Sequence, residues 1–308
     1  MVYNKEVRNL PLNIRSQEYR KDLVMSEEKK TEGQKLEERL SFRRKNAWEK
    51  VDEEYIKKAY DFCEDYKSFL NMSKTEREFA ANTEKLAVAA GFRKLDDMTA
   101  SGTRLKPGDK VYFINRKKSA VLAVIGKKPV SEGVNILGAH IDAPRLDLKQ
   151  NPLYEDTELA FFKTHYYGGI KKYQWLTIPL AIHGIVVKGD GTSVEISIGE
   201  DEDDPVFTIT DLLPHLAREQ MQKKMSEAVT GEGLNVLLGS LPYRDDKVKE
   251  KVKLTILDIL NKRYGIVEED FQSAELEIVP AQKFKDVGFD KSMVGGYGQD
   301  DRACAYPA

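Results

Sequence analysis

Two almost wholly apolar runs lie close together in the sequence, SAVLAVIG (119–126) and VNILGAH (134–140), and KVYFIN (110–115) comes just before them. Continuous apolar runs of this length are typical of strands that are covered on both faces. A helical pattern precedes the runs, with a capping box at Ser73-Lys74-Thr75-Glu76 and a stop at Gly91. A helix followed by buried strands predicts a layered α/β domain.

The pattern changes after about residue 150. The stretch LTIPLAIHGIVVKGDGTSVEISIGE (176–200) holds two β-rich runs around Gly189-Asp190-Gly191, which predicts a hairpin. A helix is expected from about Asp245 to Tyr264, and AELEIVP (274–280) alternates like a strand. This middle part therefore reads as a β-rich domain inserted into the first one.

The 308 residues are enough for two domains with hydrophobic cores. We predict four segments in chain order: a charged helical segment (1–72), the first part of a layered α/β domain (73–149), an inserted domain (150–285) and a return to the α/β domain (286–308). In the first segment apolar residues recur at helical spacing, which predicts an amphipathic helix packed on the domain or on another subunit; they are Trp48, Val51, Tyr55, Ala59, Phe62 and Phe69.

Composition excludes several classes of function. The net charge of −2 argues against nucleic acid or an anionic membrane as the main partner. The two cysteines, Cys63 and Cys304, lie far apart, so neither a disulfide framework nor a thiolate zinc site is expected. No apolar run is long enough to span a bilayer and the N-terminus has no apolar core of a signal peptide, so we expect a cytoplasmic protein.

The first motif with possible chemistry is GAHIDAPRLD (138–147). If the apolar run is a strand, His140 and Asp142 share one face at its tip, because side chains alternate along a strand. This pair suits a metal ligand and the acid that orients it, and it equally suits an ordinary surface hydrogen bond. Histidine is scarce, so any metal site must rely on carboxylates; the four histidines are His140, His165, His183 and His215.

The second motif is GGYGQDDR (295–302). Its glycines allow the chain to approach another group closely. The adjacent carboxylates of Asp300 and Asp301 repel each other unless a cation or Arg302 compensates their charge. A helix start, at which an aspartate favours the helix dipole, explains the motif as well as metal binding does.

Together these segments resemble the aspartyl aminopeptidases, a family of cytosolic di-metal aminopeptidases. The resemblance begins near residue 75 and is carried by GAHIDAPRLDLK (138–149), YYGGIKKYQWLTIPLAIHGIVV (166–187), AELEIVPA (274–281) and DVGFDKSMVGGYGQDDR (286–302). It implies a zinc-dependent aminopeptidase that removes N-terminal residues, Asp or Glu among them, from peptides by metal-activated water. Two zinc ions are expected in each complete active site.

The resemblance also implies roles for individual residues. His140 is similar to the imidazole ligand of one zinc ion, and Asp142 to the catalytic-site acid that fixes the tautomer of that ring. Asp300 is similar to the aspartate that bridges both metal ions and is followed by a cis peptide bond. Segment 150–285 is similar to the family's dimerisation domain, which implies a homo-oligomer, in the family a dodecamer.

Within that domain the family lends a histidine to a neighbouring subunit's active site, and His215 is its counterpart as a substrate-binding residue. His165 and His183 lie outside the family's ligand motifs and are expected to be structural.

In the family, four further groups follow the bridging aspartate: the catalytic glutamate, a glutamate ligand, another acidic ligand and a second histidine. No residue of this sequence matches them. We therefore expect a chain that lacks the C-terminal part of its catalytic domain and is inactive alone, while its parent enzyme is active. Two alternatives stay open: a non-catalytic oligomerisation module, and another co-catalytic metallohydrolase on the same core, which would share His140, Asp142 and Asp300.

Overall fold

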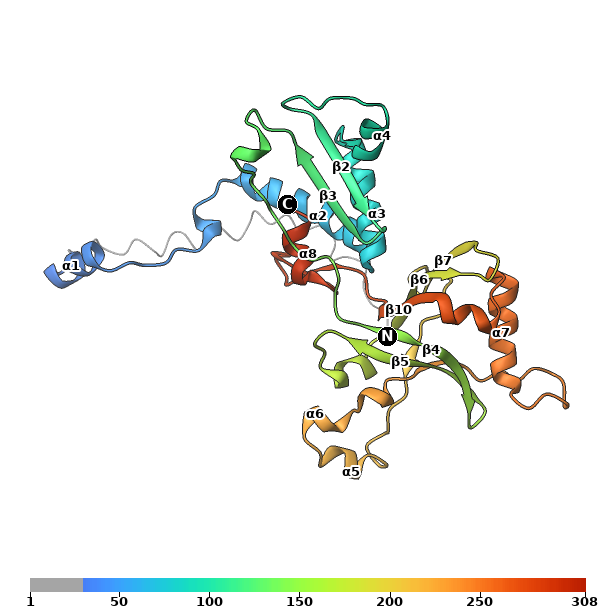
Figure 1. Ribbon diagram of the computed structural model, residues 1–308. Coiled ribbons are helices and arrows are strands. Elements are labelled where there is room, and N and C mark those ends of the chain that lie inside the picture. The colour runs from blue at the N-terminus through green and yellow to red at the C-terminus, as the bar shows by residue number, and fades with distance from the viewer. Residues whose placement is uncertain (1–29) are drawn as a thin grey trace, which may run out of the picture. The chain divides into compact units, whose positions relative to one another are not determined.

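The computed structural model, shown in Figure 1, describes residues 30–308. Predictions that concern residues 1–29 lie outside the described part of the chain. The chain divides into two compact units, Met1–Ile56 and Lys57–Ala308, and its fold is mixed α/β, as predicted. Every helix within residues 30–308 is too short or too polar to reach across a bilayer.

The described part of the first unit contains a helix and a short 3-10 turn, α1 (Glu32–Leu40) and η1 (Ala47–Glu49). The amphipathic helix predicted around Trp48 to Phe69 is present as α2 (Glu53–Asn71), but Trp48 lies in η1, before the helix begins.

A small core joins α2, α3 (Glu76–Ala89) and the last helix, α8 (Gln299–Ala305); its buried members are Tyr66, Phe69, Leu70, Phe79 and Phe284. The capping box of α3 is two residues later than predicted, with Thr75 at the N-cap and Glu78 as its partner. Ser73 lies two residues before the N-cap, and its hydroxyl instead accepts a hydrogen bond from Asn82 Nδ2 at 3.0 Å.

Three strands form the first sheet. β1 (Arg93–Lys94) pairs in parallel with β2 (Lys110–Asn115), which pairs antiparallel with β3 (Ser119–Val124), and α4 (Leu95–Ala100) lies between the first two in the chain. Strands are thus present at both predicted places, 110–115 and 119–124. The expectation that the second strand is covered on both faces is wrong, because β3 is an edge strand and its Val121, Leu122 and Val124 are 57%, 43% and 62% exposed.

The third predicted strand, 134–140, is wrong, because this stretch has no regular secondary structure. Ile136 and Leu137 are each 81% exposed. Apolar composition indicates burial, but a strand also needs a neighbour to pair with, and no strand in residues 30–308 pairs with this stretch.

A seven-stranded antiparallel sheet has the order β7-β6-β10-β4-β5-β9-β8. Its strands are β4 (Arg145–Asp156), β5 (Leu159–Tyr167), β6 (Leu180–Val187), β7 (Ser193–Ile198), β8 (Thr208–Ile209), β9 (Val236–Gly239) and β10 (Ala274–Pro280). The predicted hairpin at 176–200 is the β6–β7 pair, and the strand predicted at 274–280 is β10. The boundaries of the inserted domain stay a prediction.

The main hydrophobic core covers this sheet, and α7 (Lys251–Tyr264) packs on β4, β5 and β9 through Ile256, Leu257 and Leu260. The helix begins at Lys251, six residues after the predicted start at Asp245, and ends at Gly265 as predicted. Short elements complete the unit: η2 (Val130–Glu132), η3 (Lys172–Leu176), α5 (Arg218–Met221), α6 (Met225–Ala228), η4 (Gly231–Gly233), η5 (Glu268–Ser273), and the hairpin of β11 (Lys285–Val287) with β12 (Met293–Gly295).

Candidate metal centre

His140 and Asp300 meet in space although 160 positions separate them in the sequence. Nε2 of His140 lies 3.2 Å from Oδ1 of Asp300. Both side chains are accessible, with 52% of His140 and 95% of Asp300 exposed. The structure therefore presents an imidazole nitrogen and a carboxylate oxygen together at an open surface.

Asp142 holds the other nitrogen of the same ring. Nδ1 of His140 lies 3.1 Å from both the Oδ1 atom and the backbone oxygen of Asp142. The second carboxylate oxygen, Oδ2, accepts a hydrogen bond of 2.7 Å from the hydroxyl of Tyr167. Partial burial opposes the charged carboxylate, but the bonds from Tyr167 and His140 outweigh burial and lower the pKa of Asp142.

The same contacts act on the imidazole. Burial disfavours the charged ring, but its bonds to Asp300 and Asp142 outweigh that effect and raise the pKa of His140 above its usual value. With Nδ1 donating to Asp142, the lone pair of the neutral ring lies on Nε2, the nitrogen that faces Asp300.

Arg302 fixes the two motifs against each other. Its side chain is buried, and Nε donates to the backbone oxygen of Ile141 at 2.8 Å. Its other two nitrogens donate to the backbone oxygens of Ser73 and Lys74, at 2.8 and 3.0 Å. Arg302 thus ties the residue after His140 to the helix that carries Asp300.

The glycines of the second motif allow this close approach. Gly298 has a φ of +79°, and a Cβ atom on it would lie 2.9 Å from Nη1 of Arg302. Asp300 and Asp301 are joined by a cis peptide bond, as the family resemblance implies. No side chain hydrogen-bonds to the N-terminus of α8, but Asp300 and Asp301 lie in its first turn, so a helix start at which aspartates favour the dipole also fits this motif.

The geometry at His140 and Asp300 fits a zinc ion. Zinc binds imidazole nitrogen and carboxylate oxygen at about 2.0–2.2 Å, and a tetrahedral angle then separates two ligand atoms by about 3.3 Å. The observed separation of 3.2 Å matches that value. The donor set is also suitable, because zinc accepts both nitrogen and oxygen ligands.

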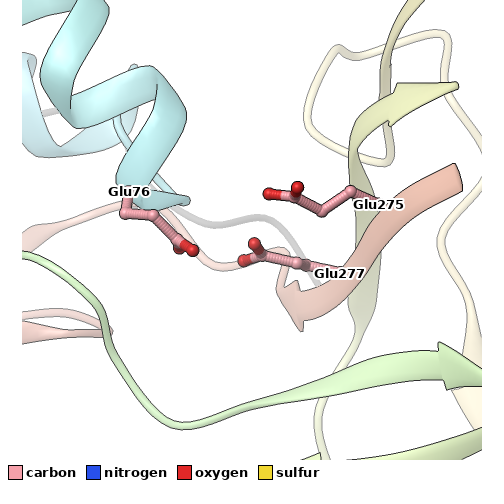
Figure 2. A group of neighbouring side chains, drawn as sticks. All are labelled: Glu76, Glu275 and Glu277. Atoms are coloured by element: carbon pink, nitrogen blue, oxygen red, sulfur yellow. The ribbon is translucent and has the colours of Figure 1, made fainter. Parts of the chain in front are cut away.

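A second group of carboxylates lies between α3 and β10 (Figure 2). Glu76, Glu275 and Glu277 each place an oxygen within 4.8 Å of the others. Cations already surround this group: Arg77 and Lys118 pair with Glu275 at 2.7 Å each.

Arg145 lies in the centre of the group. Its Nε atom is 2.8 Å from Asp147 and 3.2 Å from Glu277, and its Nη1 atom is 3.4 Å from Glu76. Burial and the neighbouring Glu76 raise the pKa of Glu277 to about 9, so this carboxyl carries a proton at neutral pH. The three remaining carboxylates are then balanced by three basic side chains, which makes this an ion-pair network rather than a metal site.

Sequence reasoning missed this network. The alternation in AELEIVP predicts an exposed face for Glu275 and Glu277, whereas Glu277 is only 2% exposed. The start of a helix covers the strand face on which this glutamate lies. That contact joins residues far apart in the sequence, so no local pattern predicts it.

The other three histidines are not part of the pair formed by His140 and Asp300. His183 is buried on β6, and its Nδ1 atom lies 2.7 Å from Glu78 and its Nε2 atom 3.5 Å from Glu200. Burial opposes protonation, but the two carboxylates outweigh it and raise the pKa of His183 to about 9. His165 is exposed on β5, and His215 lies in an exposed turn before α5.

A cavity of about 440 Å³ lies between α3, β2 and the β6–β7 hairpin, lined by residues that include Arg77, Glu78 and Glu195. Neither His140 nor Asp300 lines it. The candidate metal centre is therefore an open surface site in the described part of the chain.

Comparisons with known proteins agree with these observations. Residues 69–308 match the family model described as Aminopeptidase I zinc metalloprotease (M18). A curated relative from Clostridium acetobutylicum, "Probable M18 family aminopeptidase 1", is 58% identical over 262 residues, which cover 85% of this chain and 56% of the relative. The chain thus spans about half the length of the curated relatives it matches.

Solved structures give the same result. The crystal structure of an M18-family aminopeptidase from Thermotoga maritima matches with a TM-score of 0.79 at 47% identity, covering 86% of this chain and 56% of that one. The mApe1 dodecamer of yeast matches with a TM-score of 0.59 at 21% identity, covering 80% and 54% of the two chains, and shares the fold.

Proposed function

Because this chain belongs to the Aminopeptidase I zinc metalloprotease (M18) family, we propose that it supplies part of the active site of a zinc aminopeptidase that removes N-terminal residues from peptides. The observation that carries the proposal is the convergence of His140 and Asp300, whose facing atoms lie 3.2 Å apart. We further propose that N-terminal Asp and Glu are among the residues removed and that the protein works in the cytoplasm.

In this proposal three residues hold the metal centre. Nε2 of His140 binds one zinc ion, and the carboxylate of Asp300 is placed to bridge two. Asp142 accepts the Nδ1 proton of His140, which keeps the lone pair on Nε2 and makes the imidazole a better ligand. Bound zinc supplies a coordinated water of lowered pKa and polarises the peptide carbonyl.

The proposal does not extend to full activity of these 308 residues. A catalytic zinc site takes about three protein ligands, and hydrolysis also needs a general base. The motifs identify only His140 and Asp300 as ligands and no base. We therefore expect this chain to bind zinc weakly and to show no turnover of N-terminal aspartyl or neutral aminoacyl substrates.

Zinc binding by the 308-residue chain tests the metal centre. Competition with a chromophoric chelator would give the dissociation constant for wild type, His140→Ala, Asp300→Asn and the matched control His165→Ala. Loss of a group that only orients a ligand costs about 10–100-fold in affinity, so loss of a ligand should cost at least about tenfold. His165 is an exposed histidine on β5, and its replacement should leave the constant unchanged.

Equal zinc binding by wild type and His140→Ala would reject the metal centre and favour the oligomerisation-module alternative. Robust turnover by the chain alone would instead contradict the expected inactivity. The alternative of another co-catalytic metallohydrolase on the same core predicts the same zinc result, and a substrate preference other than N-terminal residues of peptides would distinguish it.

We also propose a homo-oligomer, as large as the dodecamer known for the distant yeast structure. Large apolar side chains are exposed in the predicted dimerisation segment, among them Leu212, Leu216, Met221 and Met225. Light scattering should give a multiple of 35.1 kDa, and a monomer mass at all concentrations would contradict the proposal. His215→Ala should leave the mass unchanged, since His215 is proposed to serve a neighbour's substrate site.

A further inference from the structure

We propose that Tyr167 is a positioning residue of the metal centre, whose hydroxyl holds the Asp142 carboxylate in the orientation that receives the Nδ1 proton of His140. The inference rests on the proposed function, because this orientation matters for a ring that binds metal through Nε2. Tyr167 touches neither substrate nor metal in this proposal; it acts through Asp142.

The contacts divide the two oxygens of Asp142 between two partners. Oδ2 accepts the Tyr167 hydroxyl at 2.7 Å, and Oδ1 faces Nδ1 of His140 at 3.1 Å. The Asp142 side chain is one-third exposed, so without Tyr167 its free oxygen would be solvated and the carboxylate could turn. A carboxylate fixed at one oxygen presents the other in a single direction.

The ring of Tyr167 is itself held by Arg145. The two residues are directly opposite each other across β4 and β5, and Cζ of Arg145 lies 4.2 Å from the ring centroid. A guanidinium over an aromatic face at this distance is an attractive cation–π contact. Arg145 is buried among Glu76, Asp147 and Glu277, so these carboxyl groups hold the guanidinium that anchors the ring.

The Tyr167 hydroxyl can donate its hydrogen bond to Asp142 at every physiological pH. A phenol is neutral at physiological pH, and the bond to Asp142 raises the pKa of Tyr167 further above its usual value. The donor is therefore present throughout the pH range in which the imidazole changes its protonation. Phenylalanine at this position keeps the ring over Arg145 and removes only the donor.

The test compares Tyr167→Phe with the matched control Tyr166→Phe in the full 308-residue chain. Tyr166 is the preceding residue on β5, is exposed, and has its ring beside Lys172 rather than Asp142. Without metal, imidazole ¹⁵N shifts would report the tautomer of His140, assigned from the signal lost in His140→Gln. Because Asp300 Oδ1 also faces Nε2 at 3.2 Å, all three chains carry Asp300→Ala and are measured with the ring neutral. There the chain with native tyrosines and Tyr166→Phe should hold one tautomer with Nδ1 protonated, and Tyr167→Phe should give an average of two.

Zinc affinity is the second readout. Tyr167→Phe should weaken zinc binding by about 10-fold, the lower end of the effect of groups that orient a ligand, and Tyr166→Phe by less than about twofold. In an Asp142→Ala background, Tyr167→Phe should have no further effect, because the group through which it acts is absent.

A third measurement does not use Tyr167→Phe. The Tyr167 hydroxyl proton should exchange with water more slowly than that of Tyr166 in the wild-type chain, and this difference should be lost in Asp142→Ala, which removes the acceptor. Equally fast exchange of the two hydroxyl protons in the wild-type chain would overturn the inference, as would an unchanged tautomer and zinc affinity in a folded Tyr167→Phe.

The outcomes also separate the two proposals. If wild type binds zinc, His140→Ala does not and Tyr167→Phe is silent, the positioning role fails and the metal centre stands. If no chain binds zinc but the tautomer still changes in Tyr167→Phe, the metal centre fails and the positioning role stands.

Discussion

Single residues hold the candidate metal centre together, and Arg302 is the clearest example. Its place after two aspartates predicts a cation that compensates their charge. In the structure its guanidinium instead donates to three backbone oxygens, those of Ile141, Ser73 and Lys74. Arg302 therefore determines where the chain runs beside His140, which is a structural rather than a compensating role.

Arg302→Met should destabilise the chain strongly. The substitution retains an unbranched side chain but leaves two buried carbonyl groups and one part-buried carbonyl group without their donor, at about 1 kcal/mol each. We expect the free energy of unfolding to fall by about 3 kcal/mol in urea denaturation. Arg218→Met, at an exposed position on α5, is the control and should change it by less than about 0.5 kcal/mol. Similar decreases in the free energy of unfolding of both variants would show that the backbone contacts of Arg302 do not stabilise the fold.

The sequence predicts some of the site and not the rest. His140, Asp142 and Asp300 stand in short motifs whose residue types suit metal binding, and the structure brings the three together. Tyr167 and Arg145 could not be identified, because their link to the centre depends on the pairing register of β4 with β5. A hydrogen bond across 25 positions leaves no local pattern in the sequence.

At the scale of elements, strand prediction succeeded where a run was both apolar and paired. β2, β3, β6, β7 and β10 all follow from their sequences. The stretch 134–140 is more apolar than several of them, yet it is not a strand, because apolar composition does not provide a pairing partner.

The long strand β4 was missed for the opposite reason. Its sequence RLDLKQNPLYED is polar and contains Pro152, which argues against a strand. The structure accommodates this by a break in register between Leu148 and Leu153, so that two short paired parts form one strand. Irregular pairing of this kind depends on the neighbouring strand and could not be foreseen.

The C-terminus of α7 gives a direct test of an element boundary. Gly265 has a φ of +67°, and a Cβ there would have no close neighbour except Lys188 Nζ at 3.6 Å. Gly265→Ala should therefore lower the free energy of unfolding by about 1 kcal/mol through backbone strain alone. Gly126→Ala, at a glycine whose nearest neighbour is 3.9 Å away and whose φ lies outside the left-handed region, should leave it equal or slightly higher. Equal effects in thermal unfolding would contradict a left-handed helix end.

At the scale of the second unit, buried charges join α3 to the seven-stranded sheet at two places. One is the network around Arg145. The other is His183 on β6, which lies between Glu78 and Glu200, with the buried Lys74 also 3.2 Å from Glu200. The sheet and the helix are thus linked by groups whose charge depends on pH.

The stability of the chain should therefore depend on His183. Its pKa rises from about 6.5 in the unfolded chain to about 9 in the folded one, so protonated His183 stabilises the fold. This contribution is complete below pH 6.5 and is lost as the pH rises through 9; at 1.36 kcal/mol for each pKa unit it amounts to about 3 kcal/mol.

Urea unfolding of wild type and His183→Gln between pH 6 and 10 would measure this contribution. The difference between their free energies of unfolding should be largest at pH 6 and shrink toward pH 10. Carboxyl groups such as Glu277 titrate in both proteins and cancel in the difference. A difference that stays constant with pH would show that the pKa of His183 is the same in the folded and the unfolded chain.

The uncovered stretch around Ile136 and Leu137 has a consequence for handling the protein. An uncharged segment whose backbone has no strand partner among residues 30–308 is a template on which another molecule can add a strand. Such templating grows with concentration, so the purified chain should precipitate more readily than its charge content suggests. A lysine introduced in that stretch would act as a gatekeeper against fibrous aggregates.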